Sequence, residues 1–332
     1  MPLLPQTLRS ARRLFLLTTA LAGGFAALPD ATAQTAWPGD KPITIVVPYP
    51  PGGSSDVIAR LLGRKLSDAL KVPVIVDNKA GAATFIATDA VRRSAADGHT
   101  LLLVDVPFAI TPHVLPSANY DPRQFTPVAL VGTAAQVFWA EGGKGRTLAQ
   151  LVEQAKAKPG EVPMASGGAG TNVHLLLEAF QKQAGIKINH VPYKGSVPML
   201  TDIGAGVVAA GFSSLASGKP LMELGRIAPL AVTSPVRDPA LPTVPTFAEL
   251  GYPGMTGEHW WGLVGPAQIN AEAASRLHRE VVAALADPEI RQQLQILAIN
   301  PRPGSAADFG KLLGQEFETW GALARQANVR ME

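Results

Sequence analysis

The 332-residue chain contains no cysteine, which excludes a disulfide scaffold, thiolate metal sites, a catalytic cysteine and a lipidated N-terminal cysteine. Charged residues are also scarce, at 17% against roughly 25% in an average soluble protein. After residue 33 no basic run is longer than Arg92-Arg93, so the concentrated cationic surface that a nucleic-acid binder needs is missing. No apolar run in that region approaches about 18 residues. We therefore expect no nucleic-acid partner and no membrane span in the mature protein.

The first 33 residues are typical of a secretory signal peptide. A basic segment that contains Arg12-Arg13 precedes an apolar stretch over residues 14–28, and Ala31-Thr32-Ala33 provides an A-x-A cleavage site. An N-terminal anchor helix is the alternative, which the well-placed small-residue site disfavours. We therefore expect export, with a mature chain that begins near Gln34. The Arg12-Arg13 pair also resembles a twin-arginine signal.

Strand-like runs alternate with helix-like periodicity along the rest of the chain. Residues 43–48 are a β-branched apolar run bounded by prolines, residues 58–69 carry apolar side chains at helical spacing, and residues 100–104 form another apolar run. This alternation predicts βαβ units and a mainly parallel sheet. A strand, a glycine-rich loop and a helix occur near residue 52 and again near residue 167, which predicts a two-lobed α/β protein with a cleft.

Both glycine-rich loops have the composition of an anion-binding loop. Residues 51–56 (Pro-Gly-Gly-Ser-Ser-Asp) and residues 166–171 (Ser-Gly-Gly-Ala-Gly-Thr) each lie between a strand and a helix. Glycines allow close approach of the backbone, and the free N–H groups of a helix N-terminus attract phosphate or carboxylate. The alternative is a tight turn in which Ser, Asp or Thr171 only caps the helix. The first loop is not a Walker A loop, because no Gly-Lys-Ser/Thr follows.

Signals for catalysis, metals and cofactors are weak. His174 and Glu178 are spaced i, i+4, but with no third ligand a hydrogen bond on the helix face is favoured over a metal site. Residues 204–209 match G-x-G-x-x-A but follow a helix-like segment, so they fail the context of a dinucleotide-binding loop. No nucleophile, base and oxyanion donors assemble. The sequence predicts no catalytic residue, no cofactor and no metal.

Several of these segments together resemble one family, the tripartite tricarboxylate transporter receptors, which are Bug-type periplasmic solute-binding proteins. The likeness extends over nearly all of residues 37–330, in order and at the family's spacing. The segments that carry it are residues 43–56, 77–82, 96–102, 165–178, 191–196 and 241–249.

The resemblance implies an α/β, two-lobed type II periplasmic-binding-protein-like fold with a hinged ligand cleft. Lobe I would be discontinuous, over residues 37–130 and 258–332, and lobe II would comprise residues 131–257. A ligand carboxylate would be held by backbone N–H groups and water between the two glycine-rich loops. Carried over by position, the ligand-binding residues are Tyr49, Gly52, Gly53, Ser54, Ser166, Gly168, Gly170 and Thr171.

The chain departs from the family pattern at the far end of the expected ligand. The family usually has a proline before Gly81 and a Gly-Gly pair near Ala82-Ala83, and an acidic or amide residue where this chain has Ser213-Ser214. We assign Ala82, Ala83, Phe85 and Ser213 to the distal end of the pocket. Their character predicts a neutral or weakly polar distal end, hence a monocarboxylate or aromatic acid in preference to citrate.

The resemblance predicts the function of a periplasmic receptor and not an enzyme. Such a receptor would act as a monomer, capture a small organic carboxylate and hand it to the membrane permease subunits of a tripartite tricarboxylate-type transporter. A ligand sensor that presents the carboxylate to a signalling ectodomain is the first alternative. A secreted hydrolase or transferase that uses the same anion loops is the second.

Overall fold

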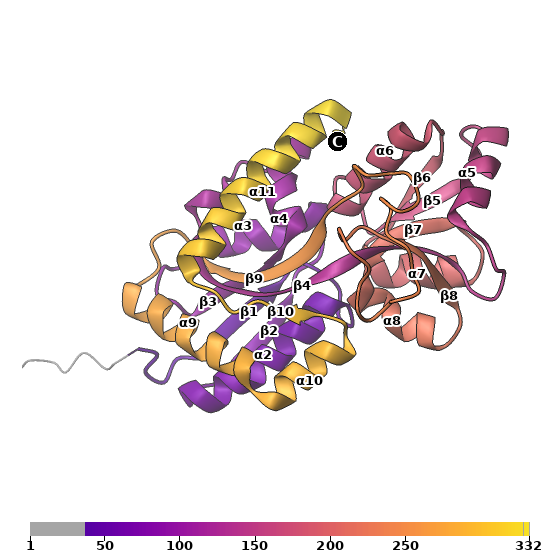
Figure 1. Ribbon diagram of the computed structural model, residues 1–332. Helices are drawn as coiled ribbons and strands as arrows, with labels where there is room; N and C mark the ends of the chain where they lie inside the picture. Colours follow the sequence, from indigo (N-terminus) through magenta and orange to yellow (C-terminus); the bar gives the residue numbers. More distant parts are fainter. Residues whose placement is uncertain (1–36, 328, 332) are drawn as a thin grey trace, which may run out of the picture. The chain divides into compact units, whose positions relative to one another are not determined.

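The computed structural model describes residues 37–327 and 329–331, so the predicted signal peptide at residues 1–33 lies outside the described residues. Within them the elements alternate as the sequence predicts, and the α/β class is confirmed (Figure 1). The strands are β1 (Ile43–Val47), β2 (Val74–Asn78), β3 (Thr100–Asp105), β4 (Thr126–Glu141), β5 (Pro163–Ser166), β6 (Asn189–Pro192), β7 (Ala210–Ser214), β8 (Ile227–Val232), β9 (Glu258–Gly265) and β10 (Asn300–Pro301).

The helices pack around these strands. They are α2 (Ser54–Leu70), α3 (Phe85–Arg92), α4 (Val106–Val114), α5 (Leu148–Ala157), α6 (Asn172–Ala184), α7 (Ser196–Gly204), α8 (Leu215–Glu223), α9 (Ala271–Ala286), α10 (Pro288–Ile296) and α11 (Ala306–Ala327), with 3-10 turns at Ala82–Thr84 and Pro122–Gln124. None of the described helices is both long enough and apolar enough to cross a lipid bilayer.

The sheet is mixed, so the prediction of a mainly parallel sheet is wrong. Its strand order is β2-β1-β3-β9-β4-β7-β5-β6, with β8 and β10 also paired to β4. The outer pairs β1·β2, β1·β3, β5·β6 and β5·β7 are parallel, as βαβ units require. The central strands β4 and β9 run antiparallel to each other and to every other strand with which they pair.

Strand β4 joins the two halves of the sheet. Residues 126–135 pair with β9, and residues 136–141 pair with β7 and β8. Figure 1 shows this strand running from the half that carries β1, β3 and β9 into the half that carries β5, β6 and β7. We call these the β1 half and the β5 half. The predicted lobe boundaries at residues 130 and 258 remain a prediction.

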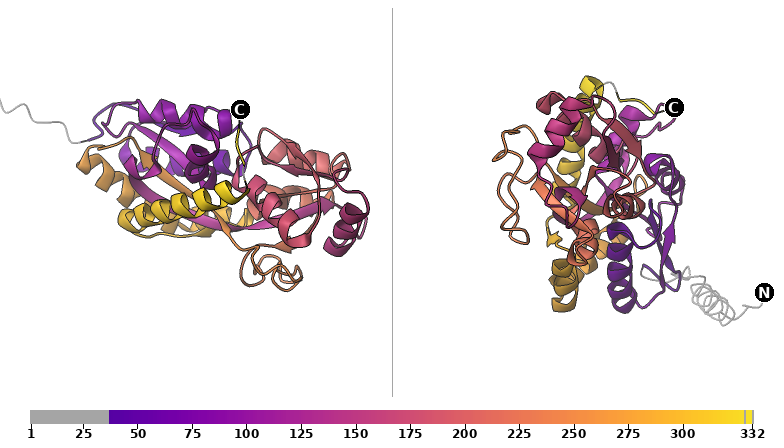
Figure 2. Two further views of the ribbon diagram at one scale, coloured as in Figure 1. Left: turned by 90° about the horizontal axis from the view of Figure 1, so that it is seen from above. Right: turned by 90° about the vertical axis from the view of Figure 1, so that its right-hand side faces the viewer.

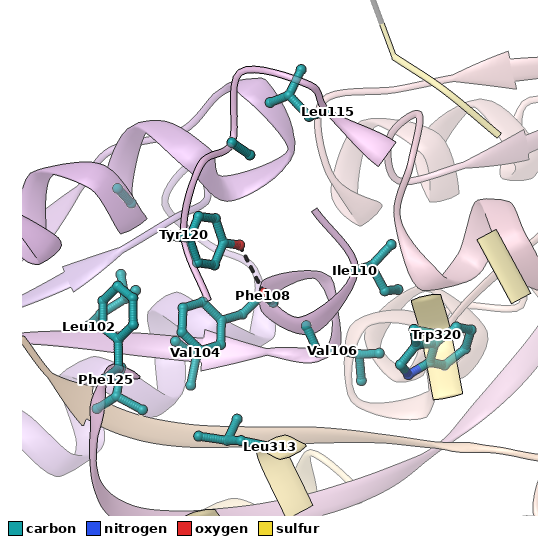
Figure 3. Packing of buried hydrophobic residues seen from close by; sticks show 14 of the residues in the cluster. Leu102, Val104, Val106, Phe108, Ile110, Leu115, Tyr120, Phe125, Leu313 and Trp320 are labelled. Atoms are coloured by element: carbon teal, nitrogen blue, oxygen red, sulfur yellow. Dashed lines mark hydrogen bonds between the residues drawn. The ribbon is translucent and has the colours of Figure 1, made fainter. Parts of the chain in front are cut away.

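Each half has its own apolar core. In the β1 half, Phe108 packs edge-on against Phe125 and stacks with Tyr120, whose hydroxyl donates to the Phe108 carbonyl at 2.8 Å (Figure 3). Helix α11 lies along this half and packs against α4 and β4 (Figure 2). A fully buried aromatic or branched aliphatic side chain contributes about 1.5–3 kcal/mol. These cores hold the ends of the strands, and hence the loops of the site, in place.

Helix caps form where the sequence predicts them. Thr147 and Gln150 make the reciprocal capping box of α5, Asn270 caps α9 and Asp287 caps α10. Each such cap is worth about 1 kcal/mol. The elements therefore begin at positions that local side-chain chemistry sets.

Candidate ligand-binding pocket

A pocket of about 680 Å³ lies at the carboxyl ends of the parallel strands, where five helices begin. Its lining includes the first residues or N-caps of α2, α4, α6, α7 and α8. The first N–H groups of a helix have no partner within the helix and carry partial positive charge. Ligands of open α/β sheets bind at this edge. Five such ends around one cavity favour an anion.

The loop between β1 and α2 is fixed by Asp56. This buried carboxylate accepts from the Gly52 N–H at 3.0 Å, from Arg60 at 2.9 and 3.0 Å, and from Asn78 Nδ2 at 3.0 Å. Burial alone would raise the pKa of Asp56, but the hydrogen bonds from Arg60, Gly52 and Asn78 outweigh that effect and hold this pKa below its ordinary value. Asn78 also donates to the Tyr49 carbonyl at 3.0 Å. The loop is therefore held in place by its own contacts.

A row of polar side chains crosses the floor of the pocket. Tyr49 Oη donates to Asp105 Oδ1 at 2.9 Å, and His259 Nε2 lies 3.4 Å from Asp105 Oδ2. Gln136 Nε2 donates to His259 Nδ1 at 3.0 Å. Burial, followed by the charge of Asp105, raises the pKa of Tyr49 well above its ordinary value, so the phenol stays a donor.

Hydroxyl groups connect the two halves of the sheet at the pocket. Ser54 Oγ of α2 lies 3.2 Å from Ser217 Oγ of α8, which lies 3.0 Å from Ser214 Oγ. The hydroxyls of Tyr49, Ser54, Ser55, Thr171, Ser213, Ser214 and Ser217 line the pocket and bond to one another, to backbone, to Trp261 or to Asp105; among the described residues none of these seven bonds to a histidine. This arrangement suits reversible binding.

The second glycine-rich loop is also stabilised internally. Ser166 Oγ lies 2.7 Å from His190 Nε2, and Thr171 Oγ1 caps α6 by accepting from the His174 N–H. The Gly170 N–H donates to His174 Nδ1 at 3.0 Å. His174 Nε2 lies 3.6 Å from Glu178, the contact on the helix face that the sequence favours over a metal site.

Of the predicted binding residues, the pocket lining brings together Tyr49, Gly53, Ser54, Thr171 and Ser213. The others lie outside it: they are Gly52, Ala82, Ala83, Phe85, Ser166, Gly168 and Gly170.

Two of the residues outside the lining have other packing partners. Phe85 stacks on Tyr120 with ring centroids 6.1 Å apart, in the core of the β1 half. A Cβ added to Gly170 would lie 2.5 Å from Met331 Sδ and 2.7 Å from Val114 Cγ2. Gly170 therefore faces the C-terminal segment and α4.

The sequence analysis missed most of the chemistry of the pocket. Two lining residues were missed at the start of α7: Lys194 precedes the helix and Ser196 is its first residue. They lie at a Gly-Ser turn after a strand, the same pattern as in the first glycine-rich loop. Asp105 ends β3 and occupies the N-cap position of α4, two residues before Pro107. These two positions carried local signals, whereas Gln136 and His259 reach the pocket only through the pairing of β4 and β9. Among the described residues, no three His, Cys, Asp or Glu side chains gather to hold a metal ion.

Comparison with known proteins bears out the resemblance. The sequence profile of the tripartite tricarboxylate transporter family receptors matches residues 58–329. Protein BugT of Bordetella pertussis is 36% identical over 296 residues, which cover 88% of this chain and 91% of that protein.

Solved structures share the fold. A protein of R. palustris solved with adipate has a TM-score of 0.84 at 32% identity, covering 89% of this chain and 99% of that one. The periplasmic binding protein BugD has a TM-score of 0.82 at 28% identity, covering 88% and 99%. MatC of Rhodopseudomonas palustris, solved with bound malate, has a TM-score of 0.80 at 26% identity, covering 85% and 98%.

These similarities confirm the predicted periplasmic-binding-protein-like fold. The profile match extends over most of the chain, and BugT is 36% identical over 91% of its own length. The chain therefore belongs to the family of tripartite tricarboxylate transporter receptors.

Proposed function

We propose that this protein is a periplasmic receptor that captures a small carboxylate in the pocket and delivers it to the membrane permease of a tripartite tricarboxylate-type transporter. The observation that carries the proposal is the convergence of five helix N-termini on one cavity. Family membership and the adipate and malate held by two relatives support it. The protein would bind its ligand without catalysis, cofactor or metal.

The carboxylate would be held mainly by backbone donors. The first-turn N–H groups of α2, at Ser54 and Ser55, and of α6, at Asn172 and Val173, belong to residues of the lining. Gly170 is not among these donors, because its N–H is already bonded to His174. Each helix N-terminus adds about 0.3–1 kcal/mol, and each charge-assisted hydrogen bond about 1.5–3 kcal/mol. Lys194, an exposed residue of the lining, adds a full positive charge.

Closure of the two predicted lobes would complete the site. The donors come from both halves, α2 from the β1 half and α6, α7 and α8 from the β5 half. The hydrogen bond between Ser54 and Ser217 spans the same two halves. Neither half alone supplies the full set of donors, so tight binding would require both.

Thermal unfolding of the mature protein tests the binding step. A panel of small mono- and dicarboxylates is compared with the neutral amide of each acid. At a hundredfold excess over its Kd, a bound acid should stabilise the protein by about 2.7 kcal/mol. The expected rise in Tm is roughly 5–10 °C, and the amides should give almost none. An amide that raised Tm as far as its acid would overturn the carboxylate site.

Uptake tests the delivery step. Cells that produce the receptor with the permease subunits should accumulate the labelled acid, and cells with the permease alone should not. Equal uptake in both would exclude the transport role. Fractionation of the same cells should place the processed protein in the periplasm.

A further inference from the structure

We propose that the C-terminal end of the chain forms a clasp that joins the two halves outside the pocket and holds the pocket closed. The clasp consists of Trp320 and Ala324 near the end of α11, Val329 and Met331, which share one apolar cluster with Leu175 of α6. The inference goes beyond the proposed function, because it concerns the balance between an open and a closed form and depends on no particular ligand.

Leu175 is a side chain of one half that is buried in the core of the other. It is 3% exposed, and all other members of its cluster lie in the predicted lobe I. The next residue of the same helix, Leu176, belongs instead to the core of the β5 half. Helix α6 therefore packs on both halves, and α4 and α11 are the helices that it meets in the β1 half.

The segment after α11 lies between α4 and the loop before α6 (Figure 2). The Met331 N–H donates to the carbonyl of Val114, the last residue of α4, at 2.7 Å. A Cβ on Gly170 would lie 2.5 Å from Met331 Sδ, so the same residue also lies against the loop of the β5 half. Val329 is buried in the cluster that contains Leu175. The C-terminal segment thus contacts both halves.

The clasp connects two helices that begin at the pocket. The N-terminal ends of α4 and α6 come from different halves, and both contribute to the pocket lining, through Pro107 and Thr171. Leu175 lies one turn beyond Thr171. An opening of the pocket that moves the first turns of these helices apart would also draw Leu175 and Gly170 away from the clasp.

Separating the clasp from α6 would expose apolar surface to water. The free energy cost is proportional to the apolar area uncovered, so the buried Leu175 side chain favours the closed form whether or not a ligand is bound. A protein that favours the closed form by itself requires less of its ligand to complete closure. The clasp would therefore tighten the binding of every ligand that depends on closure.

Distances between spin labels on the two halves test the clasp in protein that has been unfolded, dialysed and refolded without ligand. The chain has no cysteine, so Ala69→Cys on α2 and Lys182→Cys on α6 provide two specific labelling sites at exposed positions. Electron–electron double resonance should show mainly the label distance that the structure implies. A chain without residues 329–332, and Leu175→Ala, should each populate a second distance, with the ratio of closed to open form falling roughly tenfold.

Leu176→Ala is the matched control. It removes the same atoms from the neighbouring residue of α6, but from the core of the β5 half. This variant should lower Tm and leave the distribution of label distances unchanged. Combining Leu175→Ala with the truncation should shift the ratio by less than the product of the two separate effects, because both changes remove the same contact.

The outcomes are separate from those that test the proposed function. An unchanged distribution in both Leu175→Ala and the truncated chain would overturn the clasp, and so would an otherwise unaltered protein that lacks the distance the structure implies. An equal shift in Leu176→Ala would overturn it as well, because loss of packing anywhere in α6 would then be sufficient. Should Leu175→Ala fail to fold, the truncated chain decides. No ligand enters these measurements, so the clasp can fail while the carboxylate receptor stands, and the reverse.

Discussion

Three consecutive residues before α3 adopt left-handed backbone angles. The φ angles are 46° for Ala82, 48° for Ala83 and 77° for Thr84, and ψ of Ala83 is 48°. Residues other than glycine rarely adopt left-handed backbone angles, because their Cβ crowds the backbone. The cost is about 1–2 kcal/mol per residue. The turn is held by hydrogen bonds from Thr111 Oγ1 to the Ala83 carbonyl at 2.6 Å and from Thr88 Oγ1 to the Thr84 carbonyl at 3.1 Å. This chain therefore stores strain where glycine would relieve it.

Replacing Ala83 by Gly should stabilise the protein. Relief of the left-handed strain outweighs the loss of one half-buried methyl group and the greater freedom of glycine in the unfolded chain. We expect a net gain of about 1 kcal/mol and a rise in Tm of roughly 2–4 °C. Ala69→Gly is the control, since this exposed position lies in the right-handed helix α2 and should lose a similar amount. A fall in Tm for Ala83→Gly would show that the left-handed conformation of Ala83 is not strained.

At the scale of single residues, the sequence predicted part of the pocket lining. Glycine, serine and threonine in the two loops were identified because their composition after a strand is specific for a helix N-terminus. Gln136 and His259 were not, because a lone amide or histidine in an apolar strand carries no local signal. Asp105 was missed although it stands where a strand ends and a helix begins. Their chemistry arises from the strand pairing that brings β3, β9 and β4 together at the pocket.

At the scale of elements, the beginning of α6 is fixed against the C-terminal segment. Gly170 has a φ of 74°, and the Met331 N–H donates to the Val114 carbonyl at 2.7 Å. The atoms nearest to a Cβ at Gly170 belong to Met331 and Val114. The glycine that the sequence assigns to the ligand thus allows close packing between α4, the C-terminal segment and the loop before α6.

Gly170→Ala should destabilise the protein without any ligand present. The new Cβ adds left-handed strain and overpacking, together about 2–4 kcal/mol, or a fall in Tm of roughly 4–12 °C. Gly185→Ala is the matched control: it ends the same helix with a φ of 61°, and no atom lies within 4 Å of its added Cβ. That control should show the conformational cost alone. Equal effects of the two substitutions would exclude the contact with Met331.

The sequence predicted the start of a helix where a nearby side chain caps it. It did not predict elements whose position depends on packing against distant residues. The capping box at Thr147 and the caps at Asn270 and Asp287 were evident from the sequence. Strand β4 was missed, because residues 126–141 are mostly apolar or small, with no alternation between two faces. The strand is buried on both faces along most of its length, so no polar side chain marks its period.

At the scale of the whole molecule, the order of elements was predictable and the direction of the central strands was not. The alternation of strands and helices has a local signature, and the outer parallel pairs follow from it. The direction of β4 and β9 depends on the chain crossing from one half to the other and back. The pairing of β4 with β9 at those crossings joins residues that are far apart in the sequence, so it has no local signature.

The stability of the whole protein should fall in mild acid, in part through His190. Its ring stacks on His174 with centroids 4.0 Å apart. Burial, followed by the charge of His174, lowers the pKa of His190 to about 4, against 6.5 ordinarily. Between these values the unfolded chain binds a proton that the folded protein does not. The free energy of unfolding therefore decreases as the pH falls from about 6.5 to 4, by at most about 3 kcal/mol from this group.

His190→Gln should reduce that dependence on pH. Glutamine does not titrate, so the free energy of unfolding should depend less on pH. Its amide can still bond to Ser166 Oγ, so stability near neutral pH should change little. Urea unfolding at a series of pH values between about 4 and 7 measures the slope for both proteins. Parallel curves for wild type and variant would show that another group is responsible.

The passage of β4 through both halves of the sheet limits how the protein can move. The chain crosses between the halves in β4, at Ala135-Gln136, and at Glu258, and these crossings pair with each other through Ala135 and Glu258. We therefore expect any opening of the two predicted lobes to bend the chain at these adjacent, hydrogen-bonded crossings. Gln136 is both a crossing residue and part of the pocket lining, so a ligand that contacts Gln136 should restrict that bending.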